Sequence, residues 1–216
     1  LLLPDLTGHG QSPALTPDAD LSSLARDVAD TLGAQGFTGA VDWVGHSLGG
    51  RVSLAASLHA PERVKSLTLL DIAPGPVPLD LSESGFVLDI LLKAPPRADN
   101  RRALRADLTG RGLSEHLSDW LLMNLVPDGD GVRWRFDRDA LFRLHQRVNG
   151  EDLWPAVERP VHPPARCIRG GRSRYVPDES ARRLEAAGCP VATLPDAGHF
   201  VHVDSAQALL AWLTAG

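Results

Sequence analysis

The chain has 216 residues, of which 43% are hydrophobic and 23% are charged, and its formal net charge is -5. This composition is typical of a globular protein, and the length is sufficient for one domain with a substantial core. No basic cluster is dense enough to indicate a nucleic-acid surface, and no apolar run approaches the length of a membrane span. We therefore expect no nucleic-acid partner and no membrane-spanning segment.

Cysteine usage indicates the compartment and argues against a metal site. Cys167 and Cys189 are the only two cysteines, too few for a disulfide framework in a chain of this length. We interpret them as small buried hydrophobes in a reducing compartment, and we expect a cytoplasmic protein. The sequence contains no CxxC pair and no His/Cys cluster, so it predicts no metal and no cofactor.

The first elements alternate between strand and helix. We interpret residues 1–3 as the end of a strand, and residues 4–12 as a loop. An amphipathic helix is predicted over 18–35, and residues 41–44 are predicted to form a short buried strand. The apolar face of that helix carries Leu21, Leu24, Val28 and Leu32.

A G-x-S-x-G motif follows this strand and opens a helix of small and aliphatic residues over 49–58. A strand, a sharp turn at serine and a packed helix form a nucleophile elbow. The turn strains the backbone, so its neighbours must be small. We expect Gly45 to let the strand approach the helix and Gly49 to let the helix begin close to the sheet. Ser47 is therefore the predicted nucleophile.

The pattern changes after the next predicted strand, over 64–70. Residues 74–160 read as short helices with proline-rich edges, with one short extended piece at Trp134–Phe136 and no strongly apolar strand. We interpret 74–160 as a helical lid inserted into a core formed by residues 1–73 and 161–216. The helices expected in the lid span 83–92, 100–108, 114–124 and 137–148.

The strand–helix rhythm then resumes. Strands are predicted over 165–168 and 191–194, with a helix over 178–187 between them. Asp204 is expected to cap a last helix that runs to about residue 213. Strands that alternate with helices imply a parallel sheet covered on both faces, the α/β class.

A serine hydroxyl needs a base to take its proton, and His199 is the strongest of the eight histidines. It follows the last predicted strand, on a loop before the final helix. In this kind of fold the triad runs Ser, acid, His along the chain, and the histidine comes from that loop. His202 lies three residues on and is expected to pack or cap instead.

Two positions compete for the acid. The loop after strand 165–168 is the usual place, but Ser173 stands there and cannot carry the charge. Asp178, farther along, suits a helix N-cap better. Asp71 ends the strand that follows the elbow helix, where catalytic groups gather in a parallel sheet. We favour Asp71, which would orient the imidazole and stabilise its cationic form.

Further site residues follow from the fold. The backbone N–H of Leu48, the residue after the nucleophile, is the expected oxyanion-hole donor. We expect four residues to contact substrate: His46, Trp120, Phe142 and Phe200. The aromatic residues of the lid suggest an apolar acyl pocket, but they fit the lid's own core equally well.

The chain resembles the α/β hydrolases, and within them the lid-bearing esterases and thioesterases whose acid follows the strand after the nucleophile. The resemblance implies that the Asp-Ile-Ala-Pro segment carries the acid in that subgroup, and that a Gly-Gly-x-Ser segment replaces the usual acid loop. The matching stretches, over essentially the whole chain, are Leu3–Ser12, Gly45–Gly50, Leu69–Pro74, Gly170–Val176 and Gly198–His202.

The resemblance also implies strands that precede this sequence. Family members begin with further strands and a His-Gly loop that gives the second oxyanion-hole donor. We therefore expect the chain to be N-terminally incomplete, with the first strands absent. Loss of one donor costs on the order of a hundredfold or more in rate, so we expect either a fragment or a weak or dead enzyme.

We expect a serine hydrolase that cleaves small-molecule carboxylic esters or thioesters through an acyl-enzyme, without a cofactor. A haloalkane dehalogenase of the same fold needs an aspartate at position 47, where serine stands. A cofactor-free perhydrolase or a C–C bond hydrolase would use the same triad. A truncated, non-catalytic binding protein of this fold is the remaining alternative.

Overall fold

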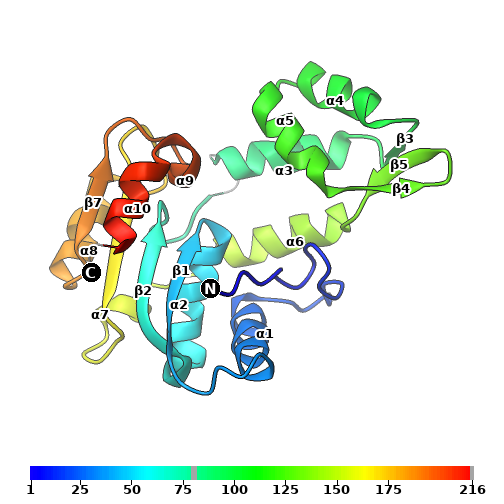
Figure 1. Cartoon of the computed structure of the whole chain (residues 1–216). Coiled ribbons are helices and arrows are strands. Elements are labelled where there is room, and N and C mark those ends of the chain that lie inside the picture. The colour runs from blue at the N-terminus through cyan, green and yellow to red at the C-terminus, as the bar shows by residue number, and fades with distance from the viewer. Residues whose placement is uncertain (79–81, 215–216) are drawn as a thin grey trace. The chain divides into compact units, whose positions relative to one another are not determined.

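The computed structural model describes residues 1–78 and 82–214 and divides into two compact units (Figure 1). The first, called here the core unit, comprises Leu21–Pro76 and Glu151–Gly216. The second, the insert unit, comprises Leu1–Asp20 and Val77–Gly150. Within the described residues no helix is long and apolar enough to cross a membrane.

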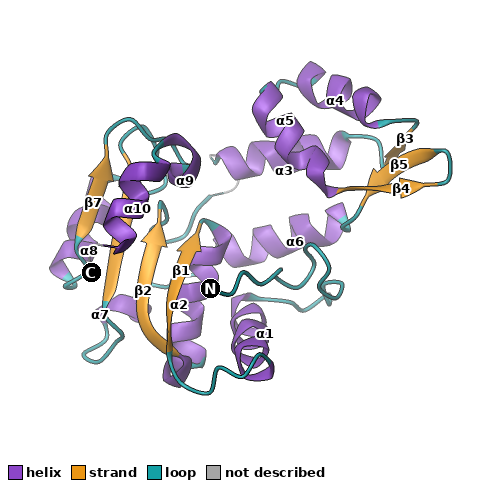
Figure 2. Ribbon diagram, viewed as in Figure 1, coloured by secondary structure: helices purple, strands orange, loops and turns teal. Residues whose placement is uncertain are grey.

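The core unit is built on a parallel sheet of four strands in the order β1-β2-β6-β7 (Figure 2). These are β1 (Val41–His46), β2 (Val64–Leu70), β6 (Ala165–Gly170) and β7 (Val191–Leu194). In the register, His46 pairs with Leu70, and Gly170 pairs with Leu194. The carboxyl ends of all four strands therefore meet at one edge of the sheet, where the loops that follow them lie together.

Helices cover both faces of this sheet, with α10 in front and α2 behind in the view of Figure 2. Apolar residues of β2, β6 and β7 pack against Val201 and Leu209 on one face. A parallel sheet covered by helices on both faces is the α/β architecture that the sequence predicted. The helices of this unit are α1 (Leu21–Ala34), α2 (Leu48–His59), η1 (Pro61–Arg63), α7 (Pro155–Glu158), α8 (Asp178–Ala186), α9 (Val201–Asp204) and α10 (Ala206–Thr214).

Arg51 joins the two chain segments of the core unit that flank the insertion. Its side chain is 1% exposed and donates hydrogen bonds to the carbonyl oxygens of Gly75 and Glu151. A backbone bond from Leu153 N–H to Pro74 O, 2.9 Å long, adds a second tie. Both carbonyl oxygens accept from the same buried guanidinium, so one side chain ties the segments before and after the insertion to each other.

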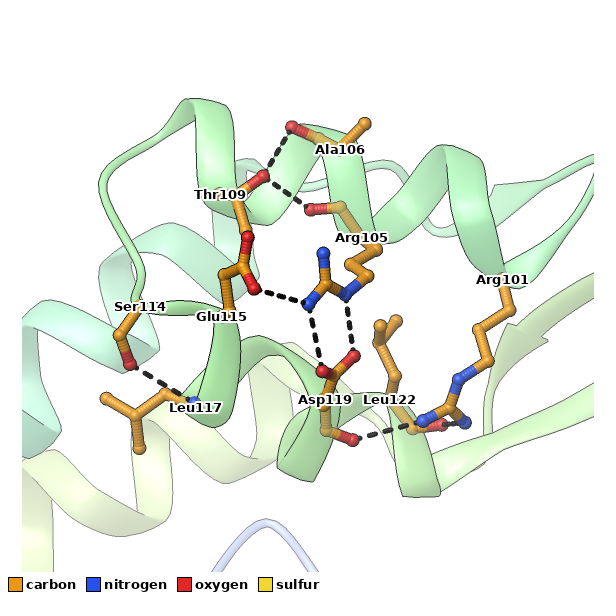
Figure 3. A network of polar contacts seen from close by, with 9 residues as sticks. All are labelled: Arg101, Arg105, Ala106, Thr109, Ser114, Glu115, Leu117, Asp119 and Leu122. Carbon is orange, nitrogen blue, oxygen red and sulfur yellow. Dashed lines mark hydrogen bonds and ion pairs between the residues drawn. The ribbon is translucent and has the colours of Figure 1, made fainter.

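The insert unit contains α3 (Glu83–Lys93), α4 (Arg101–Gly110), α5 (Glu115–Leu121), η3 (Leu122–Asn124) and α6 (Arg138–Asn149). Side chains of Ser82, Asn100, Ser114 and Asp137 cap the four α-helices by accepting backbone N–H bonds. Figure 3 shows how α4 and α5 are joined: Arg105 binds Asp119 through two bonds of 2.7 and 3.0 Å.

The insert unit also holds a small antiparallel sheet of order β3-β5-β4, which the sequence did not predict beyond one extended piece near Trp134. Its strands are β3 (Arg97–Ala98), β4 (Leu125–Asp128) and β5 (Gly131–Trp134). They are two to four residues long, and a tight turn with Gly129 at φ 59° joins β4 to β5. Strands this short carry too few residues to show an alternating pattern.

The N-terminal residues differ from expectation. Residues 1–3 form no strand, because no described strand pairs with them. Residues 1–20 group with the insert unit, whereas the predicted division places them in the core with residues 21–73. One cause is Arg147 of α6, which donates to the carbonyl oxygens of Ala19 at 2.9 Å and Pro17 at 3.3 Å.

The last predicted helix is also different. It is two helices, α9 and α10, and Asp204 is the final residue of α9 and not a cap. The Asp204 carboxylate instead accepts a 2.8 Å bond from the backbone N–H of Gly198. This bond braces the loop between β7 and α9, so the aspartate supports the loop that carries His199.

Candidate active site

Ser47 lies between the end of β1 and the start of α2, with a left-handed backbone conformation at φ 52°. Few non-glycine residues adopt this conformation, and strain of this kind marks functional turns. A Cβ on Gly45 would lie 2.4 Å from the carbonyl oxygen of Gly49, so Gly45 permits the close approach of strand and helix. The predicted role of Gly45 follows directly from this contact.

The second position at the elbow that has no room for a side chain is Gly50, and not Gly49 as predicted. A Cβ on Gly49 meets nothing within 4 Å, whereas a Cβ on Gly50 would lie 2.4 Å from Cγ2 of Ile72. The prediction for Gly49 is therefore wrong, and Gly50 is the residue that lets α2 lie close to the chain after β2. The extra glycine of the motif holds this position.

Leu48 is the first residue of α2. The N–H groups of a first helical turn have no partner within their own helix, and that of Leu48 has no acceptor among the described residues. An N–H at a helix N-terminus is suited to a developing negative charge. No second donor for such a charge is assigned among the residues that the structure describes.

Asp71 follows β2 and is fully buried, at 0% exposure. Its backbone is also left-handed, at φ 50°, which turns the chain at the strand end. The carboxylate accepts a 2.9 Å bond on Oδ1 from the backbone N–H of Gly170. Its Oδ2 accepts a bond from the Ser173 hydroxyl and lies 2.8 Å from Nδ1 of His199. Both oxygens of this buried carboxylate therefore have hydrogen-bond partners.

The contact with Asp71 fixes the tautomer of His199. An ionised carboxylate is only an acceptor, so Nδ1 of His199 carries the proton and Nε2 of the neutral ring is free to act as a base. The His199 side chain is 8% exposed. The sequence-predicted acid and base are thus brought together, although they are separated by 128 residues in the chain.

His46 connects the nucleophile elbow to the loop that carries His199. Its Nε2–H donates a 2.8 Å bond to the backbone oxygen of His199. The two rings lie 4.6 Å apart between centroids. Burial, reinforced by the neighbouring His199, lowers the pKa of His46 to about 4, so the ring is neutral near pH 7. His46 therefore holds the loop that carries His199 in position, in addition to its predicted role of contacting the substrate.

Two aromatic rings also contact His199. Tyr175, on the loop after β6, stacks on the imidazole with centroids 3.7 Å apart and planes inclined by 15°. Phe200 lies edge-on at 5.5 Å. Sequence reasoning missed Tyr175, and the available signal was its position two residues after Ser173, in a loop at the carboxyl edge of the sheet.

The remaining predicted residues have mixed outcomes. No hydrogen bond joins Ser47 Oγ to His199 among the described residues, and catalytic bonds often tighten only when substrate is present. Asp178 is the first residue of α8 and pairs with Arg169 at 2.8 Å, so it is not an N-cap as predicted. Trp120 and Phe142 lie on helices of the insert unit.

The chain is similar to known proteins over most of its length. The family model described as "Alpha/beta hydrolase family" matches residues 1–212. The chain is 41% identical over 212 residues to lipase LipV of Mycobacterium tuberculosis, covering 92% of this chain and 76% of that protein. It is 31% identical over 209 residues to esterase YbfF of Escherichia coli, covering 95% and 78%.

A solved structure, a marine microorganism esterase, matches with a TM-score of 0.85 and 24% identity, covering 98% of this chain and 82% of that one. Together with the parallel sheet and the elbow at Ser47, the family match shows that the chain belongs to the α/β hydrolases, as the sequence predicted.

Among residues 1–78 and 82–214, no group of three or more His, Cys, Asp or Glu side chains is arranged to hold a metal ion.

Proposed function

We propose that the protein is a serine hydrolase that cleaves carboxylic esters or thioesters through an acyl-enzyme intermediate. The observation that carries the proposal is the 2.8 Å contact between Asp71 and His199, at the sheet edge where Ser47 occupies a strained elbow. The relatives named as a lipase and an esterase support the same class of reaction.

In the proposed acylation step, Ser47 Oγ attacks the substrate carbonyl carbon while Nε2 of His199 accepts the hydroxyl proton. Asp71 holds the ring in the tautomer that leaves Nε2 free and stabilises the imidazolium that forms. The carbonyl oxygen gains negative charge, and the N–H of Leu48 donates to it. His199 then gives the proton to the departing alcohol or thiol, and the acyl group stays on Ser47.

Deacylation uses the same groups with water as the nucleophile. His199 takes a proton from the water, the hydroxide attacks the acyl carbon, and the bond to Ser47 Oγ breaks. The proton returns to the serine oxygen, and the carboxylic acid leaves. Each step thus needs one base and one oxyanion donor, and no cofactor enters the balance.

Ser173 supports the acid in this proposal. It stands where the sequence predicted that an acid would usually lie, and its hydroxyl donates to the oxygen of Asp71 that contacts His199. The loop after β6 therefore supplies a hydrogen-bond donor in place of a carboxylate, and the carboxylate that accepts this bond is Asp71, which follows β2. This hydrogen bond holds the Asp71 carboxylate in position beside His199.

The proposed substrates are small-molecule acyl esters. His46 and Phe200 lie beside the His199 ring, at 4.6 and 5.5 Å between centroids, and are proposed to contact the substrate. Trp120 and Phe142 are proposed to do so from the insert unit, acting as a lid. We also propose a cytoplasmic location, based on the two buried free cysteines.

The test is hydrolysis of a panel of p-nitrophenyl acyl esters and matched acyl thioesters by the purified chain and by Ser47→Ala. We expect turnover by the wild type and loss to the uncatalysed rate in the variant. Equal turnover by both proteins would refute the proposal. Perhydrolase activity is measured in parallel with acetate and hydrogen peroxide, and a vinylogous diketone tests C–C bond cleavage.

A further inference from the structure

Tyr175 and His199 form a stacked pair, with the shortest centroid distance among the aromatic contacts of His199 in the described residues. The ring centroids are 3.7 Å apart and the planes are nearly parallel, at 15°. The two residues come from different loops, one after β6 and one after β7. Tyr175 is half-buried, so the stack is partly shielded from water.

The loop that carries Tyr175 is itself tied to the acid. The backbone N–H of Tyr175 donates a 3.2 Å bond to Oγ of Ser173, and that hydroxyl donates to Asp71. Gly170, the last residue of β6, donates its N–H to the same carboxylate. One short segment therefore contacts both Asp71 and His199, which holds the tyrosine ring in place against the imidazole.

The face of an aromatic ring carries negative charge density and attracts a cation. The proposed mechanism makes His199 a cation only after it has accepted the serine or water proton. A ring fixed on the imidazole face therefore stabilises the transition state more than the resting neutral enzyme. Only such a difference between the two states raises the rate of the chemical step.

We propose that Tyr175 is a positioning residue that acts through His199 by stabilising its imidazolium form with the face of the tyrosine ring. This inference rests on the proposed serine hydrolase function. The property required is the aromatic face, so the phenolic hydroxyl is dispensable.

The other titratable groups around His199 do not replace this contribution. Asp71 faces it from the turn after β2, His46 from β1 and His202 from α9. Burial is the largest cause of the lowered pKa of His46 and of His202, and the neighbouring His199 adds to both. Both rings are thus neutral near pH 7, and all three groups stay unchanged in the variants below.

The experiment compares three substitutions at position 175. Tyr175→Phe keeps the ring face, Tyr175→Leu removes it, and pentafluorophenylalanine at position 175 keeps the shape while it reverses the charge of the face. We expect the phenylalanine variant to retain kcat within about twofold. The other two lose roughly three- to thirtyfold in kcat with little change in KM, the size expected of a partly buried cation–π contact.

The pH–rate profile gives the readout that packing alone would not move. Without the attraction the protonated imidazole is less favoured, so the acidic limb of kcat/KM moves to lower pH by about half a unit to one unit. This shift is expected in the leucine and pentafluorophenylalanine variants and not in Tyr175→Phe. If leucine at this position prevents folding, the two aromatic variants decide.

Equal kcat and equal acidic limbs for phenylalanine and pentafluorophenylalanine would overturn the inference. Ser47→Ala separates this failure from failure of the proposed function. If hydrolysis is lost in Ser47→Ala but the two aromatic variants have equal kcat and equal acidic limbs, only the proposed role of Tyr175 is refuted. Activity that survives in Ser47→Ala would remove the underlying mechanism.

Discussion

Nδ1 of His199 lies 2.8 Å from Oδ2 of Asp71, a carboxylate that follows β2, while Ser173 on the loop after β6 donates to the same oxygen. In a parallel sheet whose strand ends are aligned, neighbouring loops can reach the same point. The acid of the proposed triad can therefore come from either strand, provided that the other loop supplies a compatible partner.

The choice of acid is tested by Asp71→Asn. We expect kcat to fall by about 10⁴-fold, because an amide neither stabilises the imidazolium nor enforces the tautomer that leaves Nε2 free. The matched control is Asp178→Asn, which removes a carboxylate that is 76% exposed and pairs with Arg169. That variant should stay within about twofold of wild type. The reverse pattern would assign the acid to the later loop.

The bond from His46 to the backbone oxygen of His199 is tested by a pair of substitutions. Glutamine keeps an N–H near the position of Nε2, so His46→Gln should retain kcat within about threefold. His46→Leu removes the donor, frees the loop and should lower kcat about tenfold or more. Steady-state kinetics of both variants measure this, with thermal unfolding to confirm folding. Equal losses in the two variants would show that the donor is not what matters.

Close packing at the elbow predicts opposite effects for two nearby glycines. Gly45→Ala should lower the free energy of unfolding by about 2 kcal/mol or more, since its Cβ would lie 2.4 Å from a backbone carbonyl. Gly49→Ala should be neutral or raise it by about 0.5 kcal/mol, because its Cβ meets nothing within 4 Å and alanine favours the helix. Urea unfolding of both variants checks the contrast, and a stable Gly45→Ala would contradict it.

Buried histidines make stability depend on pH. Burial, with a smaller effect of His9, lowers the pKa of His145 to about 4 from its ordinary 6.5. The unfolded state therefore binds more protons in this range, so stability is full above about pH 6.5 and is lost as the pH falls toward 4. Nδ1 of His145 has no hydrogen-bond partner among the described residues, so replacing the ring with an apolar side chain breaks no hydrogen bond at this atom.

We therefore expect His145→Leu to flatten the loss of stability between pH 7 and pH 5, measured by urea unfolding at both values. His116→Leu is the matched control, because His116 is exposed on α5. The control should follow the wild-type dependence. A slope for His145→Leu identical to that of the control would contradict the assignment of the acid sensitivity to His145.

Much of the core was predictable because its elements carry strong local signals. The strands at Val64–Leu70 and Val191–Leu194 have the predicted bounds, since each is rich in aliphatic and β-branched residues and is bordered by turn residues. The contact of Asp71 with His199 was predictable from topology, because both follow parallel strands whose carboxyl ends share one edge.

What could not be predicted depends on contacts between segments far apart in the chain. The small β3-β5-β4 sheet has too few residues for a pattern. Gly50 is constrained by Ile72, which no local spacing reveals. The local sequence around Tyr175 gives no sign of its contact with His199, because the two rings meet only when β6 and β7 pair. Asp204 looks like a helix cap because aspartate before a helix usually is one.

The central claim, that Ser47 is activated by His199 held by Asp71, is tested most directly by covalent labelling. The intact protein is treated with a fluorophosphonate, and its mass is followed with time in the wild type, Ser47→Ala and His199→Ala. We predict one adduct per chain on Ser47 in the wild type, none in Ser47→Ala, and a reaction slowed by at least about a thousandfold in His199→Ala. Labelling of the wild type elsewhere, or at the same rate in His199→Ala, would contradict the account.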